Sequence, residues 1–500
     1  MASSTDNTVI TDVTISFTNT TSAELEASSN DWSRIDKDLY LRQGQTQTAW
    51  LHVQSKEKET LEDQDWVVTQ IAVQGLSPGS SWEQRPLGMW ILRGEVGQSD
   101  PGAFVTDLDV LFGTDAVDPR PGWTLGRNAF QLDLPTDVPL ARLTVRHGTE
   151  RPKPEVFLTT RPDGMFKIVQ ISDLHFGTGP GICEDAIDAS GRLLAPFGAD
   201  PASVEFVGRW LDIEKPDLVV LAGDQSEFGK TPDTQTAIFK YTAPLIHRCI
   251  PFAVVFGNHD DEGPPSLPRA AQMALLQSLP FCVATAGPDD IDGVGNYCLQ
   301  IAEASSQSSP LALFFLDSHN RLPVDGEVYD WIKQSQIDWF SATCRDLRKQ
   351  FEQGPLLMAF IHIPLLEYNE RDLVLTGGQR REEVMSPQYN SHFYDALAAE
   401  GVAAISCGHD HVNDYCALRP AREDSTSKLG PWLCYGGGSG FGGYGGYGGY
   451  HRRVRVFDID TKASTVVTWK RAEYCSDKVD ELVLVEDGVV VSRARRSIKL

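Results

Sequence analysis

The sequence has little cysteine, no long apolar run and a shortage of positive charge. Its nine cysteines are an odd number, all of them follow residue 182, and none forms a Cys-x-x-Cys pair. A disulfide framework or a thiolate zinc site is therefore not expected, and we interpret the cysteines as mostly buried thiols. No stretch is long and apolar enough for a membrane-spanning helix, and the first residues lack the basic and then apolar order of a secretory signal. We expect a protein of the cytoplasm, or of the cytoplasm and nucleus, with no membrane insertion.

Acidic residues outnumber basic ones by 69 to 44, which gives a formal net charge of −25. So large a negative charge disfavours nonspecific binding to nucleic acid or to an anionic membrane surface. A phosphorylated substrate would need local positive charge, which bound metal ions can supply.

The length of 500 residues predicts two or three domains. Residues 1–150 show short apolar alternations, many Thr and Trp, and a faint repeat of three units of about 40 to 50 residues. This pattern predicts an N-terminal all-β module, with pseudo-threefold symmetry as one interpretation. Such a module can bind a protein partner or carbohydrate, although a structural cover for the rest of the chain is the simpler interpretation.

Residues 151–164 are expected to form an extended linker, because prolines restrain the residues before them. From residue 165 to 470 strands alternate with amphipathic helices, which predicts an α/β (α+β) domain built as a layered αββα or α/β core. Residues 471–500 are expected to form a hairpin that turns at Asp487-Gly488, followed by a basic tail. The expected helices are Ser203 to Glu214, Thr234 to Cys249, Pro268 to Leu279, Asp330 to Phe351 and Tyr389 to Glu400.

A low-complexity run of glycines and tyrosines, Gly436 to Gly449, lies between two strand-like segments. Such a run is usually a mobile linker that packs no core. We interpret it as a long loop within the domain. Its tyrosines, with Tyr450, are candidates for the rim of a substrate site.

Five apolar, strand-like runs end abruptly in residue types that bind metals. The ligand types following them are carboxylates, imidazoles and one amide: Asp173, His175, Asp224, Asn258, His362, His409 and His411. This mixture of nitrogen and oxygen ligands suits Mn, Fe or Zn better than Ca. Seven ligands exceed the needs of one ion, so we predict two ions, with Asp224 as the shared ligand.

These five blocks, Asp-x-His, Gly-Asp, Gly-Asn-His-Asp, a single strand-end His and Gly-His-x-His, resemble those of the calcineurin-like metallophosphoesterases. Further stretches are similar to the fungal dosage-dependent cell-cycle regulator phosphatases and to plant purple-acid-phosphatase-like proteins. The resemblance covers about residues 165 to 470 and implies a four-layer αββα sandwich. It also implies that Asp173, His175, Asp224 and His411 hold one ion, and that Asp224, Asn258, His362 and His409 hold the other.

At two positions the sequence differs from the motifs of these families, which limits what the resemblance implies. The tyrosine ligand of purple enzymes is missing after Asp224, and His175 is present instead. The phosphate-gripping arginine that calcineurin-type enzymes carry in the Gly-Asp block is also missing, since the block reads Asp224-Gln225-Ser226-Glu227.

Two metal ions lower the pKa of a bound water and stabilise the charge that develops during in-line attack of the resulting hydroxide on phosphorus. The leaving oxygen then needs a proton, and His259 is our candidate donor. A carboxylate should hold its tautomer, and Asp260 and Glu227 both qualify. Asn413 and Asp414 are candidates for orienting His409 or His411.

The sequence therefore predicts a metallophosphatase that hydrolyses phosphomonoesters, with phosphoproteins as the favoured substrates. One alternative is a phosphodiesterase or nucleotidase that uses the same site. The other is a catalytically silent scaffold that binds partners through residues 1–150, although all seven ligands and His259 are intact.

Overall fold

The structure is a computed structural model and describes the chain in twelve segments. These are residues 7–18, 32–41, 47–74, 81–149, 152–227, 229–263, 266–304, 308–324, 326, 328–351, 354–420 and 429–496. The chain divides into two compact units: Met1–Lys153 with Gln235–Ala243, and Pro154–Thr234 with Pro244–Leu500.

The first unit is built from three antiparallel sheets of three strands each. They are β1 (Thr8–Thr18), β3 (Thr48–Glu57) and β2 (Trp32–Asp38); β4 (Trp66–Val73), β6 (Met89–Glu95) and β5 (Trp82–Gln84); and β7 (Val105–Phe112), β9 (Ala141–His147) and β8 (Trp123–Ala129). Each sheet has the same order, with the third strand in the centre. Apolar residues of all three sheets, such as Ile10, Val68 and Val105, pack in one core. The expected all-β character is confirmed, and the threefold symmetry stays a prediction.

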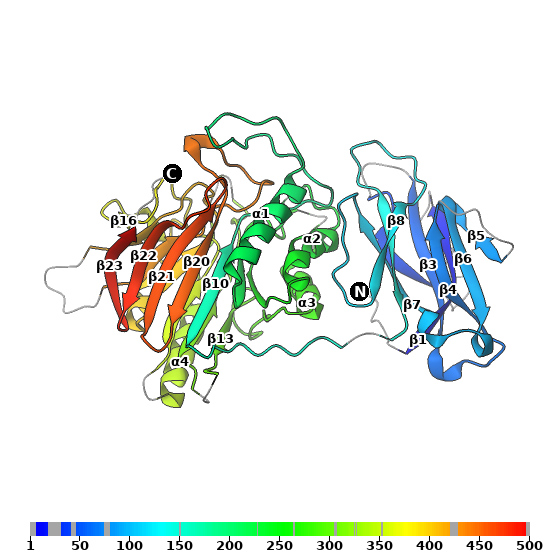
Figure 1. Ribbon diagram of the computed structural model, residues 1–500, viewed down its shortest axis with the longest axis horizontal. Helices are drawn as coiled ribbons and strands as arrows, with labels where there is room; N and C mark the ends of the chain where they lie inside the picture. Colours follow the sequence, from blue (N-terminus) through cyan, green and yellow to red (C-terminus); the bar gives the residue numbers. More distant parts are fainter. Residues whose placement is uncertain are drawn as a thin grey trace. The chain divides into compact units, whose positions relative to one another are not determined.

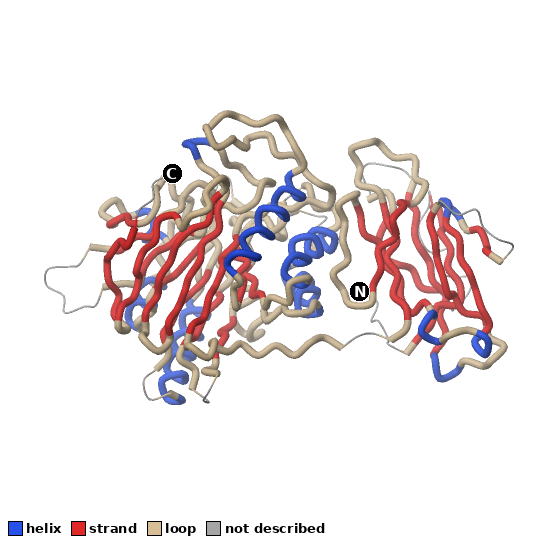
Figure 2. Tube along the Cα trace, viewed as in Figure 1, coloured by secondary structure: helices blue, strands red, loops and turns tan. Residues whose placement is uncertain are grey.

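The second unit contains two seven-stranded sheets (Figures 1 and 2). The first has the order β12 (Phe252–Val255), β11 (Leu218–Ala222), β10 (Met165–Ile171), β20 (Arg453–Asp460), β21 (Thr465–Ala472), β22 (Val479–Glu486) and β23 (Val489–Arg496). The second has the order β13 (Tyr297–Ile301), β14 (Leu311–Phe315), β15 (Leu356–Phe360), β17 (Ala404–Cys407), β19 (Trp432–Tyr435), β18 (Cys416–Leu418) and β16 (Val374–Thr376).

Side chains of the two sheets meet face to face. The rings of Phe360 on β15 and Phe457 on β20 lie 6.0 Å apart. The amide of Gln170 on β10 donates to the carbonyl of Cys407 on β17 at 2.9 Å. The apolar runs that predicted buried strands therefore lie between two layers, as expected for strands covered on both faces.

Four α-helices lie in the described part of the second unit: α1 (Ala199–Glu214), α3 (Arg269–Ser278), α4 (Gln334–Gln350) and α5 (Phe393–Ala399). Helix α2 (Thr234–Ile246) is divided, because its residues Gln235–Ala243 group with the first unit. Glu214 of α1 accepts a hydrogen bond from Trp469 of β21 at 3.0 Å, which anchors this helix to the first sheet (Figure 1). Apolar residues of α4 and α5, such as Phe340 and Leu397, pack in a core with residues of the second sheet. The expected four-layer metallophosphoesterase sandwich is confirmed. No helix in the described segments is long and apolar enough to cross a membrane.

Helix α4 begins later than the sequence pattern predicts. The backbone N–H of Lys333 donates to the side chain of Gln336 at 2.7 Å, which is a capping interaction that starts a helix. The preceding residues, Asp330 to Ile332, are not helical. The prediction that α4 begins at Asp330 was therefore wrong.

The cysteines also differ from the prediction, because Cys416 and Cys434 form a disulfide between the neighbouring strands β18 and β19. The other seven cysteines are free thiols. Four of these seven, Cys183, Cys282, Cys344 and Cys407, are buried. Spacing along the chain did not indicate the bond, because the two cysteines meet only when the strands pair.

The C-terminal hairpin turns at Asp487-Gly488, and β22 pairs with β21. It therefore continues the first sheet instead of standing apart from residues 165–470. The end of the basic tail, including Lys499, lies outside the described residues.

Candidate metal centre

The seven predicted ligands follow five strands whose carboxyl ends meet. Strands β10, β11 and β12 are mutually parallel neighbours in the first sheet, as are β15 and β17 in the second. Because carboxyl ends of parallel strands share one edge, the residues that follow them are brought together. Figure 1 shows β10 of the first sheet beside β20, β21, β22 and β23.

Six of these side chains form two compact groups, Asp173 with His175 and His411, and Asp224 with His362 and His409. Within each group the candidate ligand atoms lie within 4.8 Å of one another. Each of the six side chains is buried, with at most 8% of the residue exposed. Each group has one carboxylate and two imidazoles, a donor set that suits Mn, Fe or Zn.

Asp224 reaches both groups. Its Oδ2 lies 3.1 Å from His362 Nε2 in its own group and 4.0 Å from His175 Nε2 in the other. In the first group, the Nε2 atoms of His175 and His411 lie 2.9 Å apart. These distances are those of side chains that converge on shared points, and Asp224 is placed to bridge them.

Hydrogen bonds orient the imidazoles so that Nε2 faces the centre. The Nδ1 of His362 lies 2.9 Å from the carbonyl of Ala222, and the Nδ1 of His411 lies 2.9 Å from the carbonyl of Tyr444. A carbonyl accepts only, so each Nδ1 carries a proton, and Nε2 is the nitrogen whose lone pair can bind a metal when the ring is neutral. The Nδ1 of His175 bonds to the carboxylate of Glu227 in the same way. Such partners usually accompany imidazoles that bind metals.

Several buried polar atoms of the centre have no hydrogen-bond partner among the described residues. They are Oδ2 of Asp173, both amide atoms of Asn258 and both ring nitrogens of His409. Buried polar atoms are nearly always paired, because leaving them unpaired is unfavourable. Bound cations would satisfy Oδ2 of Asp173, the amide oxygen of Asn258 and one ring nitrogen of His409, so the residues fit a dinuclear metal site.

The backbone at these positions is strained. Asp173, His175, Asp224 and His409 have φ angles of 57°, 52°, 51° and 79°. Residues other than glycine rarely adopt this left-handed region, and such strain gathers at functional sites. Four of the seven candidate ligands therefore show a feature that packing alone does not require.

Gly257 illustrates why glycine precedes a ligand in these motifs. A Cβ at this position would lie 2.1 Å from Oδ1 of Asp224. Any side chain would therefore push apart the loops that carry Asp224 and Asn258.

Burial and neighbouring charges set the protonation of the imidazoles. Burial holds the pKa of His409 well below its ordinary value, and the charges of His362 and Arg321 act in the same direction. Burial also holds the pKa of His411 well below its ordinary value. Burial opposes protonation of His362, but the Asp224 carboxylate outweighs it and raises the pKa of His362 to about 9. His409 and His411 are thus neutral, which is the form that binds a metal.

His259 lies beside the centre without joining either group. Its ring centroid is 5.4 Å from that of His175, and its side chain is 23% exposed, so a substrate can reach it. The carboxylate nearest its Nδ1 is that of Glu262, at 2.6 Å. Sequence reasoning missed Glu262, because neighbours in a turn cannot be ranked without the backbone.

The two carboxylates suggested as partners of His259 have other contacts. Asp260 accepts hydrogen bonds from four backbone N–H groups, those of Asp224, Gln225, Ser226 and Gly257, at 2.7 to 3.0 Å. Glu227 bonds to His175. Asp260 therefore holds the Gly-Asp loop against its own loop, and the catalytic role assigned to it stays a prediction.

Asp414 does not orient His409 or His411 through a hydrogen bond to either ring. Its buried carboxylate forms ion pairs with Arg381 at 2.8 Å and Lys470 at 2.7 Å, and with Arg453. Asn413 accepts a hydrogen bond from the backbone of Arg381 at 2.8 Å. The expectation that Asp414 orients a ligand ring was wrong, because three cations occupy its carboxylate.

The glycine- and tyrosine-rich loop packs against the metal centre. Residues 436–441 of the loop are buried, and a Cβ on Gly443 would lie 2.4 Å from Cε1 of His411 and 2.6 Å from Cδ2 of His175. The ring of Tyr444 stacks on that of His411 with centroids 3.8 Å apart. The loop thus lines one side of the candidate metal centre, and its exposed residues Tyr444 and Tyr447 lie at the outer edge of that side.

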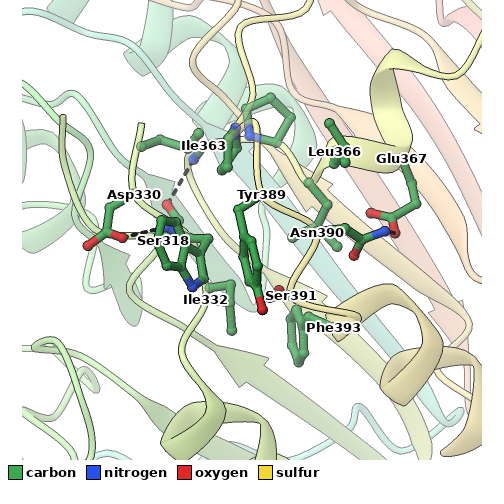
Figure 3. Close-up of a pocket in the computed structure, with 14 residues that line it drawn as sticks. Ser318, Asp330, Ile332, Ile363, Leu366, Glu367, Tyr389, Asn390, Ser391 and Phe393 are labelled. Atoms are coloured by element: carbon green, nitrogen blue, oxygen red, sulfur yellow. Dashed lines mark hydrogen bonds between the residues drawn. The ribbon is translucent and has the colours of Figure 1, made fainter. Parts of the chain in front are cut away.

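A narrow groove adjoins the centre (Figure 3). It is lined by Ile363, which directly follows His362, and by Ser318, whose hydroxyl accepts from the backbone of Ile363 at 2.9 Å. The rings of Trp331 and Tyr389 lie 4.6 Å apart along it. The groove places an aromatic surface next to a candidate ligand loop.

Comparisons with known proteins agree with this geometry. The sequence pattern described as calcineurin-like phosphoesterase matches residues 166–413. Phosphatase DCR2 of Saccharomyces cerevisiae is 38% identical over 405 residues, which cover 77% of this chain and 67% of that protein. Probable inactive purple acid phosphatase 28 of Arabidopsis thaliana is 36% identical over 362 residues, which cover 67% of this chain and 87% of that protein. These are the fungal and plant relatives that the motifs predicted.

Proposed function

Because the chain belongs to the calcineurin-like phosphoesterase family, we propose that it is a metal-dependent phosphatase that hydrolyses phosphomonoesters, with phosphoproteins as its substrates. The observation that carries the proposal is the pair of buried ligand groups with Asp224 in reach of both. A dinuclear centre with one shared carboxylate is suited to phosphoryl transfer to water.

We assign the ligands as the motifs suggest. One ion would be held by Asp173, His175, Asp224 and His411, and the other by Asp224, Asn258, His362 and His409. Mn, Fe and Zn fit these donors. When bound, the ions supply a hydroxide nucleophile at neutral pH and neutralise charge on the phosphoryl oxygens.

His259 is assigned as the proton donor to the leaving oxygen. The carboxylate of Glu262 lies 2.6 Å from its Nδ1, so Nε2 is the ring nitrogen left to face substrate and, in the imidazolium form, to deliver a proton. Glu227 and the carbonyls of Ala222 and Tyr444 keep the ligand imidazoles turned inward. The Tyr444 wall excludes water from the side of His411.

Two alternatives are retained. A phosphodiesterase or nucleotidase would use the same ligands, and rates on an aryl monoester and a bis-aryl diester distinguish it from a monoesterase. A silent scaffold is the second, because the plant relative is named probable inactive. All seven ligand positions and His259 are present here, which supports an enzyme.

The deciding experiment combines metal analysis of the purified protein with a phosphatase assay before and after chelation. We expect about two bound ions per chain and hydrolysis that chelation abolishes and Mn or Zn restores. His259→Ala should lower kcat by about 10² to 10⁴ without changing the metal content. His392→Ala is the control, because the His392 side chain is 73% exposed and contacts Asp395, and the backbone N–H that donates to Asn390 is unchanged by the substitution. A wild-type rate no higher than that of His259→Ala would favour the scaffold.

A further inference from the structure

Arg321 lies in a hairpin-like segment that follows β14 in the second sheet. Its backbone bridges that of Tyr329, and the N–H of Asp330 donates to the carbonyl of Asn320 at 2.9 Å. The N–H of Leu322 donates to the carbonyl of Val328 at 2.8 Å. These bonds tie the base of the segment and hold Arg321 in register with Tyr329.

Tyr329 fixes this register next to a candidate ligand. Its buried ring meets that of His409 edge to face, with centroids 4.7 Å apart. The guanidinium of Arg321 lies over the ring of Tyr329, 5.8 Å from its centroid. The ring of Tyr329 therefore lies between Arg321 and His409.

The other side of Arg321 faces the proton donor. Its Nη1 lies 4.0 Å from Oε1 of Glu262, whose Oε2 lies 2.6 Å from Nδ1 of His259. The side chain is 34% exposed, so a substrate bound beside His259 can contact it. Arg321 thus lies between the His409 side of the centre and His259.

Arg321 supplies positive charge that the site otherwise lacks. The Gly-Asp block carries no arginine, the centre is rich in carboxylates, and the protein has a net charge of −25. A phosphomonoester carries close to two negative charges at neutral pH. A guanidinium suits it, because its planar fork donates two parallel hydrogen bonds to phosphate oxygens.

The contact with Glu262 does not prevent such binding. An ion pair at 4.0 Å with a one-third exposed arginine contributes little free energy. Exchanging it for a charge-assisted, bidentate contact with phosphate is favourable, and Glu262 would remain on His259.

We propose that Arg321 is a phosphate-binding residue of this centre, whose guanidinium binds the nonbridging oxygens of a phosphomonoester while His259 faces the leaving oxygen. The inference rests on the proposed function for its site, but it makes a separate statement about anion binding. It also names a source of substrate preference. A diester has one negative charge and one fewer terminal oxygen, so it gains less from Arg321.

The test measures binding of inorganic phosphate by calorimetry to the metal-loaded full chain, for wild type, Arg321→Ala, Arg321→Lys and Arg248→Ala. Arg248 is a matched control, because it is 31% exposed and pairs with a single carboxylate, Asp212, at 2.7 Å. We expect Arg321→Ala to weaken phosphate binding about tenfold or more, Arg321→Lys to weaken it less, and Arg248→Ala to leave it unchanged. Thermal unfolding of each variant checks that the fold is intact.

A kinetic measurement separates binding from folding effects. In Arg321→Ala, kcat/KM for an aryl monoester should fall at least about tenfold more than for a bis-aryl diester. The proposal is overturned if Arg321→Ala binds phosphate within twofold of wild type, or if monoester and diester rates fall equally. Should the wild type bind phosphate through Arg321 but hydrolyse nothing, the proposed function fails and this inference stands.

Discussion

Asp260 and Glu262 are two residues apart in one turn, yet their carboxylates have different neighbours. Asp260 accepts four backbone N–H bonds, three of them from residues 224–226. Glu262 lies against His259. The conformation of the backbone in the turn decides which carboxylate faces His259. The order of residues in the sequence does not predict that conformation.

Asp260→Asn tests whether this carboxylate is structural. The amide presents donors where four N–H groups need acceptors, so we expect unfolding in urea to show a loss of about 1.5 to 3 kcal/mol. Once folded and loaded with metal, the variant should keep the pH profile of kcat. A changed pH profile with unchanged stability would instead support the catalytic role predicted from sequence.

Glu227→Gln tests the orientation of His175. Glu227 bonds to Nδ1 of that ring, and replacing a partner of a ligand imidazole usually lowers metal affinity about 10- to 100-fold. Competition with a chelator should show this loss for Glu227→Gln. The control Glu400→Gln, whose side chain pairs with Arg348, should retain metal as the wild type does; equal retention by both variants would contradict the assignment.

At the scale of elements, the glycine- and tyrosine-rich loop is the segment whose composition was least informative. Its glycines suggested mobility, whereas residues 436–441 are buried. Glycine is present because the backbone passes within contact distance of His175 and His411. Low-complexity sequence carries no signal of such a long-range approach, so only its rim tyrosines could be proposed from sequence.

Gly443→Ala should disrupt the centre, because the new Cβ would lie 2.4 Å from Cε1 of His411. Overpacking of this kind costs about 1 to 3 kcal/mol, and bound metal measured by elemental analysis should fall with it. Gly449→Ala, in the same loop, strains a φ of 73° but has nothing within 4 Å of the new Cβ, so it controls for backbone strain alone and should keep its metal. Normal metal content in Gly443→Ala would contradict this prediction, because it would show that the loop backbone can move away from His411 without loss of the metal site.

Asp414 links the second sheet to β20 and β21 of the first through Arg453 and Lys470. Burial would raise the pKa of Asp414, but these cations and Arg381 outweigh it and hold the pKa well below its ordinary value. A lowered folded-state pKa means that the stabilisation is present above the unfolded value, about 3.9, and is lost as pH falls through the folded value.

Asp414→Asn should therefore destabilise the protein at neutral pH, by about 3 to 5 kcal/mol, because it leaves buried cations unbalanced. The difference from wild type should shrink as the pH falls below about 4. Urea unfolding at several pH values measures this, with Asp346→Asn as an exposed control whose partner is Lys349. A difference that does not change with pH would contradict the ionic origin.

At the scale of the whole molecule, the order of motifs along the chain predicted most of the elements that carry the ligands. Five strand ends, two layers of sheet and the all-β first unit followed from apolar runs and from the ligand types after them. The start of α4 and the Cys416–Cys434 bond did not follow. The first depends on a local capping contact and the second on strand pairing, and neither leaves a periodic pattern in the sequence.

Chelation should lower the thermal stability of the protein. Unpaired buried atoms of Asp173, Asn258 and His409 are satisfied by bound cations, which stabilise the folded state by about 3 kcal/mol at a hundredfold excess over Kd. Differential scanning calorimetry with and without chelator measures the shift. Mn or Zn should restore it, and Ca should not, since its preferred ligands are all oxygen. Equal restoration by Ca would point to a site elsewhere.

The ligand groups draw on residues from 173 to 411 and on both sheets. No continuous segment shorter than about half of the chain carries them all. Ion uptake during refolding should therefore report when the strands that carry the ligands have come together, which makes metal binding a measure of assembly between the two sheets.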